Sequence, residues 1–294
     1  MIYRTRNVIG ALLFVVMAAM AGIVTYAQST AVSPLHPFEP NEELVMGVEF
    51  SRSLLKSVDV AEFHFTSSRD PSAATEVGMQ STLKLTGEVS SKGFFARLFN
   101  LKFREWMESL VDPESFSVNS TKRIDEQGKR SRISEAVYTD GKVRWTERDP
   151  NNPSSEPRTA EAAFSGQIHD VLSAIYFLRT QPLFPGKTLE LKISDSGRVY
   201  QIPVRVVEKK RLKTVLGKVD TVRVDPALFG PNGMISREAH LSIWYTNDKR
   251  RIPVKAKIKT EYGTFDVSLK KLTNVPPQDY LNAAANSRTK SIKP

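Results

Sequence analysis

Short connections between strand-like segments are the feature that most limits how this chain can fold. Segments in which apolar and polar residues alternate recur along most of its length, as at 44–50, and such alternation is typical of half-buried strands. Connections such as 139–141 (Thr-Asp-Gly) and 195–197 (Asp-Ser-Gly) are too short for the crossover that parallel neighbours need. Neighbouring strands are therefore expected to be antiparallel, in a mainly β protein.

The alternating segments predict where the strands lie. Within 57–66 the apolar positions change parity at Val60 and Ala61, which predicts a β-bulge. The aromatic-rich segment 94–111 is expected to be a short helix over 94–99 followed by a strand. The basic run 209–211 is expected to lie in a hairpin turn. The other expected strands are 44–50, 77–89, 117–124, 131–138, 142–148, 187–194, 198–207, 212–216, 219–224, 239–246, 252–261 and 263–272.

One segment, about 166–180, has the apolar periodicity of an amphipathic helix. Ser165 is a candidate N-cap, because its hydroxyl can accept a hydrogen bond from the first turn. Pro182 ends the helix, since proline does not fit a helix interior. The proline-rich stretch 149–157 before the helix is expected to be a surface loop.

The first residues have the layout of a secretory signal peptide. Arg4 and Arg6 precede an uncharged, apolar run at 8–24, and the small residues of 25–27 (Thr-Tyr-Ala) form a cleavage site. The run is slightly shorter than the stretch of about 20 apolar residues that a transmembrane helix needs. Cleavage near Ala27 is expected, and an uncleaved membrane anchor is the alternative. Both place the remainder in the periplasm or an equivalent extracytoplasmic space.

The expected organisation is a signal peptide at 1–27, an extended leader at 28–41, a single β-rich domain at 42–273 and a disordered tail at 274–294. Two β subdomains joined at 149–164 are the alternative. The chain has no cysteine, which excludes disulfides, a thiolate metal site and a cysteine nucleophile. It also excludes attachment to a membrane through a lipidated cysteine.

The chain carries a formal net charge of +10 at pH 7. Anionic partners are therefore expected, such as lipid head groups or acidic envelope polymers. Contact with a membrane is expected only at its surface or through an uncleaved signal. Nucleic acid is a poor candidate because the protein is expected to be exported. A solvated basic surface without a specific partner is the simpler interpretation.

No pattern of catalytic residues stands out in the sequence. The histidines His36, His64, His169 and His240 lie far apart and lack the spacing of metal ligands, so no metal site is expected. His169 is expected on the helix surface. The chain has no nucleophile elbow, phosphate-binding loop or dinucleotide-binding motif, so neither a cofactor nor an enzymatic activity is expected. Pairs of nearby acids suit a glycosidase, but among 32 acidic residues such pairs arise by chance.

The motif Asp-Val-Leu-Ser-Ala-Ile-Tyr-Phe-Leu-Arg at 170–179 is followed by proline, leucine and glycine within 182–186. Together with the opening at 37–44 and the stretch at 243–254, it resembles an exported bacterial family known as domain of unknown function 3108. The resemblance covers about 37–272. It implies a β-rich envelope protein and assigns no activity.

The chain departs from that family's pattern at one position, since Asn41 stands where a glycine more often precedes the glutamate. In the helix, Tyr176 and Arg179 lie one turn apart and are expected to meet at the rim of the sheet. Arg179 is either a structural hydrogen-bond donor or an anchor for an anion, and the structural role is favoured. Asp248 is expected to be a turn former between two strands.

These observations predict a strongly curved antiparallel sheet or incomplete barrel, with one main helix packed on or inside its concave side. The favoured function is non-enzymatic binding of a hydrophobic or amphipathic ligand, such as a lipid or a lipid-linked glycan. The alternatives are a scaffold or assembly factor for another envelope protein and an envelope glycan hydrolase. The candidate ligand-binding residues are Phe95, Phe99, Phe103, Trp106, Tyr176 and Arg179.

Overall fold

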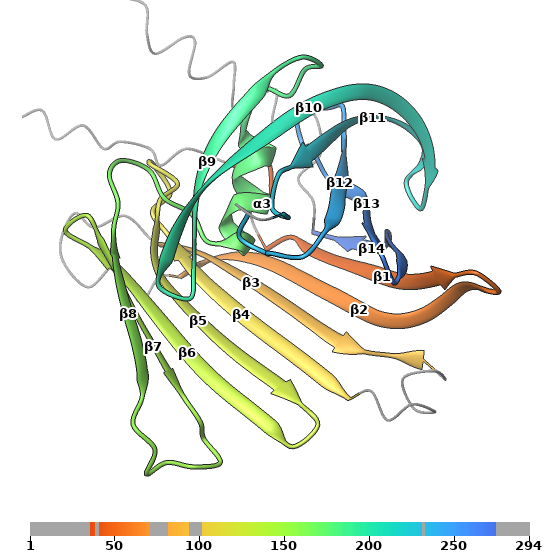
Figure 1. Cartoon of the computed structure of the whole chain (residues 1–294). Helices are drawn as coiled ribbons and strands as arrows, with labels where there is room; N and C mark the ends of the chain where they lie inside the picture. The colour runs from red at the N-terminus through yellow and green to blue at the C-terminus, as the bar shows by residue number, and fades with distance from the viewer. Residues whose placement is uncertain (1–35, 39–40, 71–81, 94–101, 231–232, 275–294) are drawn as a thin grey trace, which may run out of the picture. The chain divides into compact units, whose positions relative to one another are not determined.

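Fourteen antiparallel strands form one sheet in the computed structural model (Figure 1). The structure describes residues 36–38, 41–70, 82–93, 102–230 and 233–274, all within the unit Pro34–Pro294. The strands are β1 (Glu43–Arg52), β2 (Leu55–Asp70), β3 (Thr82–Ser91), β4 (Phe103–Val111), β5 (Val118–Gln127), β6 (Arg130–Thr139), β7 (Lys142–Arg148), β8 (Arg158–Ala163), β9 (Thr188–Asp195), β10 (Arg198–Thr214), β11 (Gly217–Pro226), β12 (Ala239–Thr246), β13 (Pro253–Thr260) and β14 (Gly263–Thr273).

The two halves of the chain meet in the middle of the sheet. The strand order is β8-β7-β6-β5-β4-β3-β2-β1-β14-β13-β12-β11-β10-β9, so β1 pairs with β14 and every other pair is consecutive in sequence. The edge strands β8 and β9 follow each other in the chain but do not pair. The sheet therefore curves without closing, and the predicted antiparallel, incomplete barrel is confirmed.

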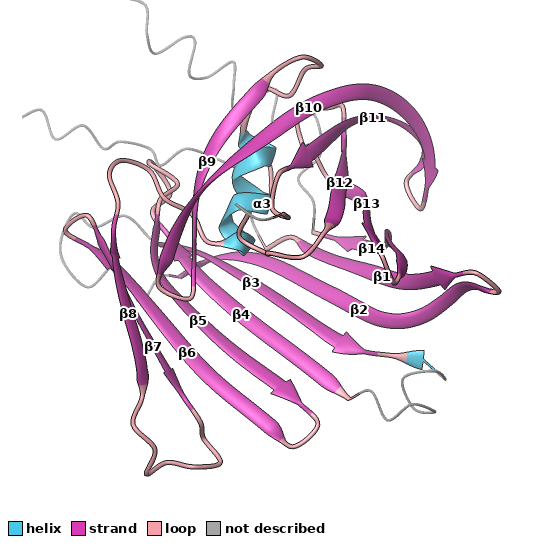
Figure 2. Cartoon of the chain, in the orientation of Figure 1, coloured by secondary structure: helices cyan, strands magenta, loops and turns pink. Residues whose placement is uncertain are grey.

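A ten-residue helix, α3 (Val171–Thr180), lies on the concave side of the sheet (Figure 2). Leu172 packs with Leu83 and Leu85 of β3, and Leu178 packs with Leu191 of β9. Burying one such leucine fully contributes about 1.5–3 kcal/mol. The helix thus joins the interior strand β3 to the edge strand β9 through apolar contacts, as the sequence predicted for a helix inside a curved sheet.

The helix begins later than its apolar periodicity predicted. Asp170, not Ser165, is the N-cap: the Ser173 backbone N–H donates to Asp170 Oδ1 at 2.7 Å, and the Asp170 N–H donates to Ser173 Oγ at 2.9 Å. Residues Ile168 and His169 are extended. Both residues are buried between two strands. The backbone oxygen of Ile168 accepts a hydrogen bond from Val118 of β5, and the backbone of His169 exchanges two hydrogen bonds with β9.

Several strand boundaries also differ from the prediction. The expected strands 198–207 and 212–216 are one strand, β10, so the basic run 209–211 lies in a strand and not in a turn. A register shift between Val206 and Glu208 lets the chain continue through this charged run. The loop 149–157 is followed by β8, which the sequence did not reveal. The expected helix at 94–99 lies outside the described residues.

The predicted bulge in β2 is confirmed. Val48 of β1 pairs with Ala61, and the next residue, Glu49, pairs with Asp59, so Val60 is the extra residue. This insertion puts Val58, which pairs with Phe50, on the same face as Ala61, which pairs with Val48 in the hydrophobic core. A one-residue slip would otherwise have moved the apolar set to the other face.

The gap between the two sheet edges is narrowed by the β9–β10 turn. Gly197 of this turn has a φ of +72°, and a Cβ atom added there would lie 2.5 Å from the Ala160 Cβ of β8. It would also lie 3.1 Å from the Trp145 Cβ of β7. Glycine is required at this position both by the backbone angle and by the close approach of the two edges.

We expect Gly197→Ala to lower the free energy of unfolding by about 1–3 kcal/mol more than Gly217→Ala, because only the first substitution forces two elements apart. Gly217 is a matched control, since its φ is +88° and no heavy atom lies within 4 Å of an added Cβ. Urea denaturation of both variants measures the difference. Equal losses would mean that the turn does not touch β8 in solution.

Candidate functional site

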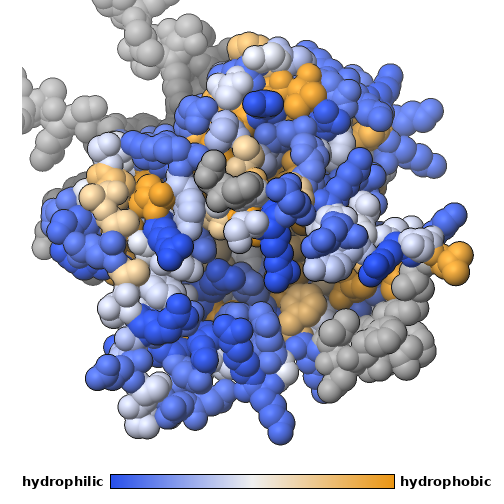
Figure 3. All heavy atoms as spheres, in the orientation of Figure 1, coloured by the Kyte–Doolittle hydropathy of each residue, from blue (hydrophilic) through white to orange (hydrophobic). Residues whose placement is uncertain are grey.

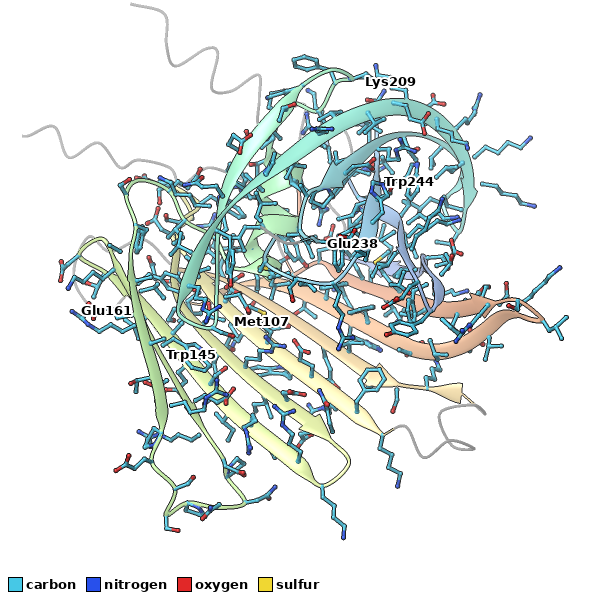
Figure 4. The ribbon with its side chains drawn as sticks, in the orientation of Figure 1. Met107, Trp145, Glu161, Lys209, Glu238 and Trp244 are labelled. Carbon is cyan, nitrogen blue, oxygen red and sulfur yellow. The ribbon has the colours of Figure 1, made fainter. Side chains whose placement is uncertain are left out.

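Two adjoining hollows lie on the concave face beside α3. The larger, which we call the polar compartment, has a volume of about 290 Å³ and lies under the β9–β10 turn. Figure 4 marks Met107 and Trp145 of its lining. It is lined by Met107, Thr121, Arg123, Asp125, Arg130, Arg132, Ser134, Ala136, Tyr138, Trp145, Glu147, Asp170, Ser194, Asp195 and Ser196.

The smaller hollow, the apolar cleft, has a volume of about 130 Å³ and lies between α3 and strands β2 to β4. That volume is close to the roughly 150 Å³ of an engineered apolar cavity that holds benzene. The helix approaches the sheet closely here, since a Cβ at Gly87 would lie 3.3 Å from Leu172 Cδ1. The cleft is lined by Phe63, Phe65, Gly87, Glu88, Val89, Glu105, Met107, Val171, Leu172 and Ile175.

A single row of directly opposed residues connects the two hollows. It crosses six neighbouring strands, β2 to β7, with one residue from each strand. The row begins with apolar or small residues in the cleft and ends with polar ones in the compartment, and Met107 belongs to both linings. In order, the row is Phe65, Gly87, Met107, Arg123, Ser134 and Glu147.

Two of the three arginines that line the polar compartment, Arg123 and Arg132, form ion pairs with acids. Arg123 Nε lies 2.9 Å from Glu105 Oε1, and its Nη1 lies 3.5 Å from Asp195 Oδ1. Arg132 forms ion pairs with Asp149 and, at 3.9 Å, with Glu147. The compartment therefore offers alternating hydrogen-bond donors and acceptors rather than a surplus of one charge.

Tyr138 places a phenol beside the start of α3. Burial raises the pKa of Tyr138 well above its usual value, and the nearby Asp170 carboxylate raises it further. Thr121 Oγ1 donates to Asp170 Oδ2 at 2.7 Å, so this carboxylate is held from both the helix and β5. The phenol stays protonated at neutral pH and hydrogen-bonds with the side chains of Ser194 and Thr121.

The concave hollows open toward a hydrophilic surface. In Figure 3 the region over β4 to β8 is covered mostly by hydrophilic side chains. The row of paired residues from Phe65 to Glu147 extends from the apolar cleft into this polar half of the sheet.

A different cluster, around Arg179, occupies the far end of α3. Both Arg179 and Glu42 are fully buried, with 0% exposure. The guanidinium donates to both carboxylate oxygens of Glu42, from Nη2 at 2.8 Å and from Nη1. Its Nε donates to the backbone oxygen of Arg250 at 3.3 Å. The favoured structural role of Arg179 agrees with this geometry, because its donors are used inside the protein.

Aromatic rings shield the Arg179–Glu42 ion pair from water. The guanidinium carbon lies 5.0 Å from the ring centre of Phe38 and 5.5 Å from that of Tyr176. Phe38 belongs to the expected leader, yet it is buried against α3. Burial raises the pKa of Tyr176 above its usual value, and the negative charge of Glu42 adds to the effect.

The β12–β13 loop completes this cluster. Asp248 Oδ1 accepts from the backbone N–H groups of Arg250 and Arg251, at 3.0 and 3.1 Å, which is the expected turn-forming role. Burial raises the pKa of Asp248, but hydrogen bonds from Thr246 and Arg250 outweigh it and leave the pKa lowered. Arg251 Nη1 then donates to the backbone oxygen of Arg179 at 3.1 Å, so the loop holds the end of α3.

The structure does not bring the four described candidates for ligand binding, Phe103, Trp106, Tyr176 and Arg179, together. Phe95 and Phe99 lie outside the described residues. Phe103, with 37% exposure, and Trp106 lie three positions apart on β4 and therefore point to opposite faces. Tyr176 and Arg179 are buried in the ion-pair cluster. The residues of the two hollows come from seven strands, the β9–β10 turn and α3 with its N-cap, and only the folded arrangement of these elements identifies them.

The expected surface position of His169 is wrong. Its side chain is 1% exposed and lies 4.3 Å from the ring centre of Phe177. Burial lowers the pKa of His169 to about 4, so the imidazole is neutral at physiological pH. The interpretation failed because it placed His169 on a helix, whereas the residue is extended and bridges to β9.

Within the described ranges, no three histidine, aspartate or glutamate side chains lie close enough together to hold a metal ion. No helix found in those parts of the chain has the length and apolar character needed to cross a membrane.

Comparison with known proteins identifies a family. The model of DUF3108, described as a protein of unknown function, matches residues 52–270. The chain belongs to the DUF3108 family. No curated protein matches it. The DUF3108 chain is also similar to a solved beta-barrel-like protein of the domain of unknown function DUF1849 from Brucella abortus, with 9% identity and a TM-score of 0.49, over 81% of this chain and 98% of that one.

For this DUF3108 protein, we expect Glu42→Gln to lower the free energy of unfolding by about 3–5 kcal/mol, because it leaves the buried Arg179 guanidinium without its counter-charge. The control is Glu88→Gln, which breaks an exposed bidentate pair with Arg104 at 2.8 and 3.1 Å. Such exposed pairs contribute about 0–1 kcal/mol. Urea denaturation compares the two variants, and similar losses would contradict a buried ion pair.

The buried His169 makes the DUF3108 fold sensitive to acid. Its folded pKa of about 4 lies below the ordinary value of 6.5, so the unfolded chain takes up the proton first as the pH falls. Stability from this group is present above about pH 6.5 and is lost toward pH 4. We expect it to account for about 2 kcal/mol of the stability lost between pH 7 and pH 5.

Urea denaturation at pH 7 and pH 5 measures this dependence. His169→Gln should flatten it, whereas His64→Gln, at a half-exposed surface histidine, should keep the wild-type difference. An unchanged pH dependence in His169→Gln would show that the imidazole is not held neutral in the folded protein.

Proposed function

We propose that this protein is an exported, non-enzymatic binding protein for an amphipathic, lipid-like ligand. The observation that carries the proposal is the row from Phe65 to Glu147, which changes from apolar to polar across six strands of the concave face. An amphipathic molecule needs such a transition within one site. The segment 1–27, with the layout of a signal peptide, supports an extracytoplasmic location.

The apolar part of the ligand would occupy the apolar cleft. Phe65, Val171 and Ile175 supply its walls, and Met107 forms its boundary with the polar compartment. Methionine suits a boundary of this kind because its unbranched, polarisable side chain adapts to different shapes. A cleft of about 130 Å³ takes a benzene-sized portion of a chain, so the remainder of a longer chain would extend along α3.

The polar part would occupy the polar compartment. Because Arg123 and Arg132 already pair with acids, the compartment suits a head group rich in hydroxyls more than a bare anion. Ser134 and Tyr138 add neutral donors and acceptors, and Trp145 offers a ring face. A lipid-linked glycan has this combination of a hydroxyl-rich head and an apolar chain.

The state of the acids in the compartment supports binding rather than hydrolysis. Asp170 caps α3, Asp195 pairs with Arg123, and Glu147 lies 2.8 Å from Arg158 Nη1. Asp125 accepts from Gln127 at 3.1 Å. A glycosidase needs one acid that stays protonated and a second that faces the scissile bond, and these carboxylates are engaged in structural contacts instead.

We expect dodecyl maltoside below its micellar concentration to bind as a single molecule, because it combines a disaccharide head with an apolar chain. Met107→Gln should weaken binding about tenfold, since it places an amide at the apolar boundary. Trp106→Gln is the matched control: it changes the neighbouring residue on the opposite face of β4 and should leave affinity unchanged. Isothermal titration calorimetry provides the dissociation constants.

Native mass spectrometry of the protein purified from bacterial envelopes is the complementary measurement. A co-purified mass that is lost in Met107→Gln and retained in Trp106→Gln supports the proposal. Absence of any co-purified amphiphile, together with equal affinity of both variants for dodecyl maltoside, would overturn it.

The free edge of β8 favours a second candidate function, a scaffold for another envelope protein. Among the strands that the structure describes, β8 pairs with β7 alone, through residues from Arg158 to Ala163. An edge strand of this kind can accept an extended segment from a partner. Photocrosslinking in cells from a probe at Thr159 would support this function by trapping one abundant protein, and the absence of any adduct would dismiss it.

A further inference from the structure

The hairpin formed by β10 and β11 carries an unusual concentration of positive charge. Its outer part, residues 207–219, defines the basic hairpin. Figure 1 shows it reaching away from the helix, and Figure 4 shows Lys209 on the outer side of β10. Its exposed cations are Lys209, Lys210, Arg211, Lys213 and Lys218.

The two faces of the basic hairpin differ. Leu212 and Leu216 are partly buried and pack against a core cluster that includes Trp244 and Val254. The alternate positions, Arg211, Lys213 and Val215, are exposed, and Val215 at the tip is 57% exposed. The hairpin is therefore fixed to the protein by its apolar face and presents a basic face with an apolar tip to solvent.

The cations of the basic hairpin outnumber the acidic residues beside them, Glu208 and Asp220. Lys213 and Lys218 are directly opposite each other in the β10–β11 ladder, an arrangement that is destabilising for like charges. Arg211 has only Asp220, at 3.7 Å, and both side chains are largely exposed. Across the residues that the structure describes, no ion pair within 4 Å involves Lys209, Lys210, Lys213 or Lys218. On β7, by contrast, Lys142 and Arg144 both pair with Glu161.

A second hairpin tip has a similar composition. Leu54, in the β1–β2 turn, is 98% exposed and lies between the exposed side chains of Arg52 and Lys56. Both tips extend toward the same side of the view in Figure 1. Each therefore combines an isolated apolar side chain with flanking cations.

We propose that the basic hairpin docks on an anionic phospholipid surface. The cations meet lipid head groups, which relieves the repulsion between Lys213 and Lys218, and Val215 enters the boundary between head groups and acyl chains. A soluble polyanion accounts for the cations but gives no partner to the exposed Val215. None of these residues lines the concave hollows, so this proposal and the proposed function stand or fall separately.

Co-sedimentation with vesicles tests the proposal. The wild-type full chain should bind phosphatidylglycerol-containing vesicles and not vesicles of phosphatidylcholine alone. Lys213→Gln/Lys218→Gln should weaken partitioning about 25-fold, because each cation near an anionic surface contributes about fivefold. Val215→Ser should weaken it about tenfold through lost apolar burial.

Lys142→Gln/Arg144→Gln is the matched control, since it removes the same charge from half-exposed positions on β7. It should change partitioning less than twofold, and thermal melts should show all variants folded. Three results would overturn the proposal: no preference for anionic vesicles, equal losses in the control, or binding to dextran sulfate instead of vesicles with no effect of Val215→Ser.

Discussion

The buried ion pair between Arg179 and Glu42 is the contact on which the rest of the structure depends. Glu42 immediately precedes β1, in the middle of the sheet, and Arg179 lies in the last turn of α3, so the pair ties the helix to the sheet centre. A buried ion pair is stable only when its remaining hydrogen-bonding groups also have partners. Here the Arg179 guanidinium donates to the backbone oxygen of Arg250 and lies against the rings of Phe38 and Tyr176. Because the pair fixes α3 on the concave side, it also determines where the apolar cleft and the polar compartment lie.

The sequence allowed the fold class to be predicted because its signals are local. Alternation in β1 and short turns such as 195–197 specify antiparallel neighbours without knowledge of distant residues. The start of α3 was mispredicted because Ile168 is apolar for a non-local reason, its burial between β5 and β9. The continuation of β10 through 209–211 was missed because a charged run lacks the apolar alternation of a half-buried strand.

The candidate site could not be predicted to the same extent. An aromatic-rich segment suggested Phe103 and Trp106, but the period of two in a strand sends these side chains to opposite faces. The row through Met107 and Arg123 takes one residue from each of six strands, and no single stretch of sequence contains more than one of them. Its composition becomes visible only when the register of every ladder is known.

The family motif at 170–179 supplies only part of the walls of the hollows, through Asp170, Val171, Leu172 and Ile175. The three segments that carry the resemblance, at 37–44, 170–186 and 243–254, converge on Arg179 through Glu42 and the Asp248 loop. None of the six residues of the row from Phe65 to Glu147 belongs to them. A substitution at Met107 or Ser134 therefore changes the chemistry of the hollows without disturbing the ion pair.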